Sequence, residues 1–323
     1  MELIAEAPGR FFTGMALDAH GDVFVICAFS GELLRLDKER KVLVPIMATE
    51  VSPHGIAIEP RSGSVFITDR GENAIVKLYC VETPATEEES GAKNPEEGAY
   101  STVRYLNTFE GRPLRGPTAI AFSPSGELLF TDAGSEGDSS FSSPMGAVYR
   151  TVLGHERLLP ICPHGLIRPS AIAVAPDSSV YVCEQGTNRV LRFVRRSTYF
   201  VGNVFAQLQG GMGPRAIAVS PKDGTIFVAQ YELNSAESVE AGEEVEVEDV
   251  PESAKGVITV FGKDGEVQGI VRTPNPCITA VAIDDTGSTL YVIEGDEVAG
   301  RSWLYRINLA PGEMDSEQKN HAE

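Results

Sequence analysis

A sixfold repeat constrains this chain more than any other feature. The stretch Pro169–Phe193 reads PSAIAVAPDSSVYVCEQGTNRVLRF: an apolar strand, a turn, a second strand, a polar corner and a third strand. Its first strand recurs around six anchor alanines, which are Ala16, Ala57, Ala121, Ala173, Ala218 and Ala282. The tightest spacings, about 41 and 45 residues, are typical of a four-stranded propeller blade. The sequence therefore predicts an all-β, six-bladed β-propeller with four antiparallel strands in each blade.

The two ends of the chain are predicted to complete one blade together. The sixth repeat has no fourth strand of its own, because the chain becomes polar after Leu304–Leu309. The apolar–polar segment Glu2–Ala7 at the opposite terminus supplies the missing strand. We expect Met1–Ala7 to pair antiparallel with Trp303–Leu309, which closes the ring and removes free sheet edges.

The repeat also predicts one domain, because a single blade cannot bury both of its faces. We place this domain at residues 1–312. Two strongly acidic inserts, at about 82–98 and 232–254, interrupt it and have the composition of solvated loops. The tail 313–323 is predicted to be disordered.

Charge and composition exclude several classes of protein. The formal net charge of −19 opposes general binding of nucleic acid or of an anionic membrane. No apolar run reaches the ~18–20 residues of a membrane span, and the acidic N-terminus is unlike a signal peptide. Five cysteines without CxxC spacing are typical of reduced thiols, so we expect a cytoplasmic protein.

Several segments resemble known propeller families. The segments VFITDRGENAIVKLY and VYVCEQGTNRVLRF resemble the NHL repeat, whose second strand ends in Ala-Asp before a turn, Asn, Arg and a third strand. The segments LLFTDAG, GAVYR and NVFAQLQG resemble the SMP-30/gluconolactonase and strictosidine-synthase-like families. These resemblances imply the six-bladed fold, whereas their functions range from hydrolases, synthases and lyases to pure binding modules.

The resemblance to the SMP-30 type implies a metal site whose ligands precede the first strands. The matching positions here are Thr13, Thr118, Ser170 and Arg215. None is a carboxylate, and an arginine would place a cation where the metal binds, so we predict no metal and no cofactor. His54, in PHGIAI, resembles the histidine-bearing strand of the amidating lyase, but Thr279 and the other matching positions carry no histidine. His54 is either a hydrogen-bonded structural residue or a ligand or acid–base group.

Two further sets of charged residues have competing interpretations. Acidic residues recur at the ends of the second strands, namely Asp69, Asp132, Glu184 and Glu294. They form either a carboxylate ring or caps that accept backbone hydrogen bonds within each blade. A basic strip lies on the third strand of the fourth repeat and just beyond it, namely Arg189, Arg192, Arg195 and Arg196. It either binds an acidic partner or RNA, or is a solvated strand that pairs with the protein's own acidic loops.

The sequence favours a non-catalytic propeller scaffold that binds another protein or macromolecule. The alternative is a diverged SMP-30/gluconolactonase-like hydrolase acting on a lactone or ester with a bound metal. We predict no catalytic residue, and a protein partner that presents an anionic group to one mouth of the channel. The candidate binding residues at that mouth are Thr13, His54, Thr118, Ser170, Arg215 and Thr279.

Overall fold

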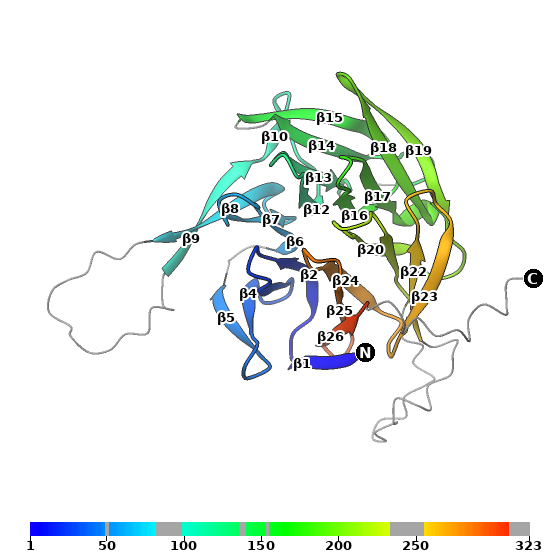
Figure 1. Cartoon of the computed structure of the whole chain (residues 1–323). Helices are drawn as coiled ribbons and strands as arrows, with labels where there is room; N and C mark the ends of the chain where they lie inside the picture. The colour runs from blue at the N-terminus through cyan, green and yellow to red at the C-terminus, as the bar shows by residue number, and fades with distance from the viewer. Residues whose placement is uncertain (49–51, 82–98, 136–139, 153–154, 233–254, 310–323) are drawn as a thin grey trace, which may run out of the picture.

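The structure is a computed structural model of the chain, and it describes residues 1–48, 52–81, 99–135, 140–152, 155–232 and 255–309. The predicted tail and both predicted acidic inserts, apart from Glu232, lie outside these residues. The described residues form six four-stranded sheets arranged around a common axis (Figure 1).

Each sheet is an antiparallel blade whose first strand lies nearest the axis (Figure 1). Blade 1 contains β2 (Phe12–Leu17), β3 (Val23–Cys27), β4 (Glu32–Asp37) and β5 (Val42–Ala48). Blade 2 contains β6 (Pro53–Ile58), β7 (Val65–Asp69), β8 (Ala74–Val81) and β9 (Ala99–Leu106). Blade 3 contains β12 (Pro117–Phe122), β13 (Leu128–Asp132), β14 (Gly146–Val152) and β15 (His155–Leu166).

The remaining three blades follow the same order. Blade 4 contains β16 (Pro169–Val174), β17 (Val180–Glu184), β18 (Arg189–Arg196) and β19 (Tyr199–Gln207). Blade 5 contains β20 (Pro214–Val219), β21 (Ile226–Gln230), β22 (Gly256–Phe261) and β23 (Val267–Thr273). Blade 6 contains β24 (Ile278–Ile283), β25 (Thr289–Asp296), β26 (Arg301–Asn308) and β1 (Glu2–Pro8). Outside the blades lie the β10–β11 hairpin (Thr108–Phe109 and Arg112–Pro113) and the 3₁₀ turn η1 (Gln185–Thr187).

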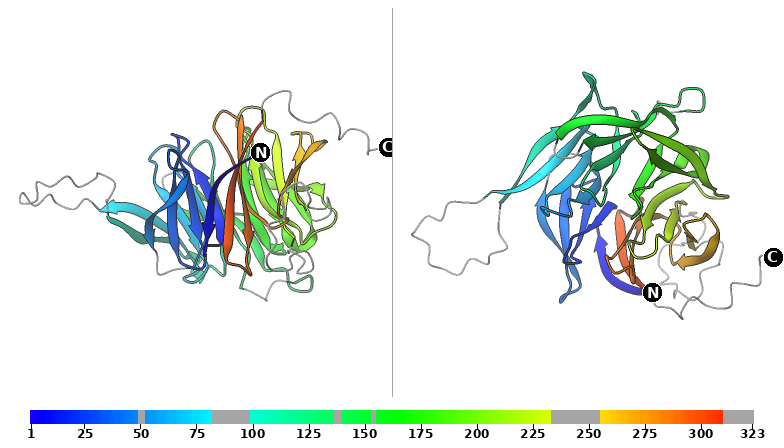
Figure 2. Two further views of the ribbon diagram at one scale, coloured as in Figure 1. Left: turned by 90° about the horizontal axis from the view of Figure 1, so that it is seen from below. Right: turned by 45° about the horizontal axis from the view of Figure 1, so that its top comes forward.

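Closure by the N-terminal strand is confirmed. Strand β1 is the outer strand of blade 6 and runs antiparallel to β26, with Glu2 opposite Arg306 and Pro8 opposite Arg301 (Figures 1 and 2). The partner segment therefore begins at Arg301, two residues before the predicted Trp303. Within β1, the side chains of Ala5 and Ala7 are buried, whereas the side chain of Leu3 is 47% exposed.

The hydrophobic core is divided among the faces between blades. Six clusters of buried side chains are found in the described residues, one at each junction of neighbouring blades. Ile26 of blade 1 packs with Ile67 of blade 2, for example, and Val25 on the other face of blade 1 packs with Leu304 of blade 6. Each blade thus depends on both neighbours to remove its apolar faces from water.

Close packing of the first strands explains their small residues. A Cβ atom built at Gly55 would lie 2.6 Å from the Thr118 carbonyl oxygen of the next blade, closer than any real contact. Alanine occupies the matching position in blades 3 to 6, for example at Ala119 and Ala171. The axis of the ring is consequently a narrow channel.

Two further sequence predictions concern thiols and membranes. The described cysteine side chains are free thiols, at Cys27, Cys162, Cys183 and Cys277. Among the described residues, no helix is long and apolar enough to cross a membrane.

Removal of β1 should destabilise the ring. Deleting residues 1–7 exposes the edge of β26 and the buried surface beneath Ala5 and Ala7. We expect a fall in melting temperature of at least ~5 °C and concentration-dependent self-association, measured by calorimetry and light scattering. The control Leu3→Ser changes a half-exposed side chain of the same strand and should alter stability by less than ~0.5 kcal/mol. Unchanged melting and unchanged solubility of the deletion variant would contradict the role of β1 in closure.

Candidate functional site

The six residues predicted at the channel mouth do come together. Each is the second residue of a first strand, and all six line one cavity of about 80 Å³ on the axis. The set comprises Thr13, His54, Thr118, Ser170, Arg215 and Thr279. Whether they bind a ligand stays a prediction.

Some of these side chains join neighbouring blades. The Ser170 hydroxyl donates a 2.7 Å hydrogen bond to the Pro214 carbonyl of the next blade. The His54 Nδ1 atom lies 3.3 Å from the Thr118 carbonyl oxygen of the next blade. The Thr13 hydroxyl is buried and has no hydrogen-bond partner among the described residues.

Arg215 and His54 form the central contact of the site. A guanidinium nitrogen of Arg215 lies 3.0 Å from His54 Nε2. Because a guanidinium can only donate, Nε2 accepts and the proton of the neutral ring is on Nδ1, facing Thr118. Burial, reinforced by the charges of Arg215 and Arg70, lowers the pKa of His54 well below its usual value, which keeps the ring neutral.

A wider cavity opens directly above the channel. Its volume is about 680 Å³, and arginines from four successive blades line it, namely Arg70, Arg115, Arg168 and Arg215. We call these four residues the arginine mouth. The sequence identified only the last of them, because the other three occupy three different positions of the repeat and form no periodic pattern.

Three members of the arginine mouth converge further. Arg70, Arg168 and Arg215 also line a smaller cavity of about 190 Å³, together with the hydroxyl residues Thr118 and Ser170. We call this cavity the anion subsite. Among the described residues, its lining contains no carboxylate.

The guanidinium groups of the arginine mouth form no ion pair with a carboxylate of the described part of the chain. Burial, together with the nearby charges of Arg70 and Arg168, lowers the pKa of Arg215. Arg115 is exposed and places Nη1 3.7 Å from the Met145 sulfur. A partly buried cation without a counterion is costly, so this end of the channel is a strong candidate for anion binding.

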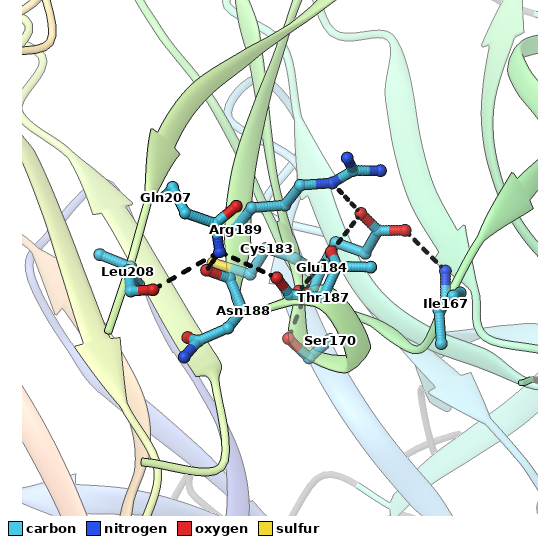
Figure 3. A network of polar contacts seen from close by, with 9 residues as sticks. All are labelled: Ile167, Ser170, Cys183, Glu184, Thr187, Asn188, Arg189, Gln207 and Leu208. Carbon is cyan, nitrogen blue, oxygen red and sulfur yellow. Dashed lines mark hydrogen bonds and ion pairs between the residues drawn. The ribbon is translucent and has the colours of Figure 1, made fainter. Parts of the chain in front are cut away.

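The carboxylates at the ends of the second strands hold the loops that carry the mouth. Glu184 is buried and accepts a 2.8 Å hydrogen bond from the Ile167 backbone N–H and a 2.6 Å bond from the Thr187 hydroxyl (Figure 3). Its second oxygen also pairs with Arg189. These bonds fix the segment at Arg168, whose backbone has the left-handed φ of 54° and therefore costs about 1 kcal/mol.

The other three carboxylates act in the same way. Asp69 accepts from the Ser52 backbone at 3.2 Å, and Asp132 accepts from the Arg115 backbone at 2.9 Å. Glu294 accepts from the Asn275 backbone at 3.1 Å and from its side-chain amide at 2.8 Å. These carboxylates are caps within each blade, and the interpretation as a ring of carboxylates in the channel is wrong.

The basic strip on β18 is largely neutralised within the chain. Arg189 pairs with Glu184, Arg192 lies 3.2 Å from Asp177, and Arg195 lies 3.6 Å from Glu127. Arg196 at the end of the strand is exposed. The strip therefore offers less free positive charge than the arginine mouth.

The donor groups on the axis do not fit a divalent cation. The cavity there is lined by hydroxyls, one imidazole that accepts from Arg215, and the Arg215 guanidinium itself. Calcium and magnesium require several oxygen ligands with carboxylates among them. In the described part of the chain, no group of three or more His, Cys, Asp or Glu residues is arranged to hold a metal.

No protein-family model and no curated protein sequence matches this chain. Solved structures match its fold. A gluconolactonase from Xanthomonas campestris has a TM-score of 0.67 and 16% identity over 94% of this chain and 89% of its own. A calcium-binding protein, regucalcin, from Agrobacterium tumefaciens has a TM-score of 0.66 and 16% identity over 94% and 92%. A chain of the nidogen/laminin complex has a TM-score of 0.59 and 13% identity over 85% of both chains. At these identities the likeness shows the six-bladed fold alone.

Glu294 should make stability depend on pH. Burial raises its pKa to about 7, against 4.5 ordinarily, so the folded protein binds more protons than the unfolded chain between these values. Its contribution to stability is therefore present below about pH 4.5 and is lost as the pH rises to about 7. We expect Glu294→Gln to match the wild type near pH 5 and to be more stable at pH 8 by ~1–3 kcal/mol, measured by urea unfolding. The control Glu266→Gln alters an exposed carboxylate. A wild-type advantage at pH 8 would contradict the raised pKa of the buried Glu294 carboxyl.

His54 should stay neutral through the physiological range. Nitrogen-detected NMR of its ring is expected to show the Nδ1–H tautomer at a pH well below that at which an ordinary histidine becomes protonated, with the other four of the five histidines as internal references. In Arg215→Met the pKa of His54 should rise, because the substitution removes a neighbouring positive charge. An identical titration of His54 in both proteins would show that the contact with Arg215 is not formed in solution.

Proposed function

We propose that this propeller is a binding module that recognises an anionic segment of a partner protein through the arginine mouth. The observation that carries the proposal is the set of four arginines from successive blades, which face one cavity of about 680 Å³ without carboxylate partners in the described part of the chain. The adjoining anion subsite shares Arg70, Arg168 and Arg215 with that cavity and is large enough for one carboxylate or phosphate group, which the guanidinium groups would bind through charge-assisted hydrogen bonds.

Local electrostatics support an anionic rather than a cationic partner. The protein carries a formal charge of −19, yet within the described part of the chain the mouth holds four arginines and one lining carboxylate, Glu297. A carboxylate or phosphate at Arg215 would compensate a charge that is now partly buried beside a neutral imidazole. An anion would gain this electrostatic interaction by binding alone, without covalent chemistry. Folding has already removed water from the arginine, so less desolvation is left to oppose the binding of an anion.

The arrangement favours binding over hydrolysis. The gluconolactonase and the calcium-binding regucalcin share the fold with this chain. The six axial residues here lack the carboxylates that a dication would need, and the histidine accepts a hydrogen bond from an arginine. Metal-dependent hydrolysis of a lactone or ester stays the alternative.

The test is calorimetric titration with an acetylated hexaglutamate peptide and a matched hexaserine peptide. We expect hexaglutamate alone to bind and Arg215→Met to weaken it at least ~10-fold, about 1.4 kcal/mol. The matched control is Arg196→Ala, which removes an exposed arginine outside the mouth and should leave the affinity unchanged.

Three outcomes would count against the proposal. Equal weakening by Arg196→Ala and Arg215→Met would move the binding surface to the basic strip. Failure of the wild type to bind hexaglutamate would remove the acidic segment as the ligand. Turnover of glucono-δ-lactone by the wild type that is abolished by a chelator would favour the hydrolase.

A further inference from the structure

One side of the mouth is aromatic. Phe29 lies in the turn between β3 and β4, and its side chain is 64% exposed. Its ring is stacked on that of Phe11, with centroids 5.5 Å apart and planes inclined by 25°. Both rings line the same 680 Å³ cavity as the arginine mouth. We call this pair the aromatic wall.

The fold holds the inner ring of the aromatic wall in place. Phe11 is 5% exposed, and a Cβ atom built at Gly295 of blade 6 would lie only 2.5 Å from its ring. The absence of a side chain at Gly295 thus leaves the space that the ring fills. Phe29 therefore stacks on a fixed partner. This contact reduces the entropy cost of ordering the Phe29 side chain when a ligand packs against the wall.

The arginines and the aromatic wall come from different blades, although Met212 and Tyr231 also line the cavity. The four arginines come from blades 2, 3, 4 and 5, whereas the aromatic wall belongs to blade 1. Glu297, in the turn after β25 of blade 6, lines the cavity beside blade 1. Its charge disfavours an anion on that side, so an anionic group is directed toward the anion subsite and the remainder of the ligand toward Phe29.

We propose that the mouth recognises an acidic segment in which an aromatic side chain lies next to the acidic one. The acidic group occupies the anion subsite at Arg70, Arg168 and Arg215, and the aromatic side chain packs on the exposed face of Phe29. This inference rests on the proposed function and adds the sequence preference of the partner. A volume of about 680 Å³ holds two or three side chains, which suits a short motif.

The experiment compares two acetylated, amidated tripeptides, Glu-Phe-Glu and Glu-Ala-Glu, by titration calorimetry. The wild type should bind Glu-Phe-Glu roughly three- to tenfold more tightly, as expected for one added aromatic contact. Phe29→Ser should remove this preference by lowering the affinity for Glu-Phe-Glu to about that for Glu-Ala-Glu, and Phe29→Tyr should restore it. Arg215→Met should weaken both peptides by a similar factor.

The outcomes separate this inference from the proposed function. Equal affinity of the wild type for both tripeptides, with hexaglutamate still bound, overturns the aromatic preference alone. Loss of Glu-Ala-Glu binding in Phe29→Ser also overturns it, because Phe29 would then support the fold of the mouth rather than contact the aromatic residue. A preference for phenyl phosphate over methyl phosphate without binding of either peptide overturns the protein partner and assigns the wall to a small aromatic anion.

Discussion

The requirement that every blade bury two apolar faces governs the whole molecule. A blade has a neighbour on each side, and the six clusters in the described residues lie between blades rather than within them. An open row of blades would leave two faces in water, so the ring must close. Strand β1 closes the ring, because it completes blade 6 and buries Ala5 and Ala7 against the last strands of the chain. The energy of the fold therefore depends on contact between segments about 300 residues apart in sequence.

The same packing determines where a ligand can bind. The first strands of neighbouring blades lie so close together that Gly55 has no room for a Cβ atom. They therefore leave an axial cavity of only about 80 Å³. Space opens above the axis, where the turns after the second strands and the segments before the first strands surround about 680 Å³. Buried carboxylates such as Glu184 and Asp132 fix these segments through backbone N–H groups, so the arginines are carried on rigid supports.

Electrostatics at the mouth oppose those of the whole protein. A charge of −19 repels anions at long range, but salt at physiological strength screens such repulsion beyond about 8 Å. Within the cavity, Arg70, Arg168 and Arg215 dominate. His54 accepts from Arg215 because burial and the neighbouring charges lower its pKa, and the resulting contact orients the guanidinium. The acidic composition of the whole protein is thus compatible with a site for anions, since short-range geometry rather than net charge decides what binds there.

Period and residue type were enough to predict the number of blades, the small residues on the first strands and the closing role of Glu2–Ala7, because each follows from a local pattern that recurs. The pattern also placed Arg215 and His54 at the axis, since they start first strands. Tertiary structure alone decided the rest. Arg70, Arg115 and Arg168 share no repeat position, and Phe29 lies in an ordinary-looking turn, so their convergence depends on how the ring brings different loops to one end. Likewise the sequence left open whether the basic strip pairs within the chain, and only the structure shows that Asp177 and Glu127 neutralise much of it, because pairing across strands and blades is invisible to a linear pattern.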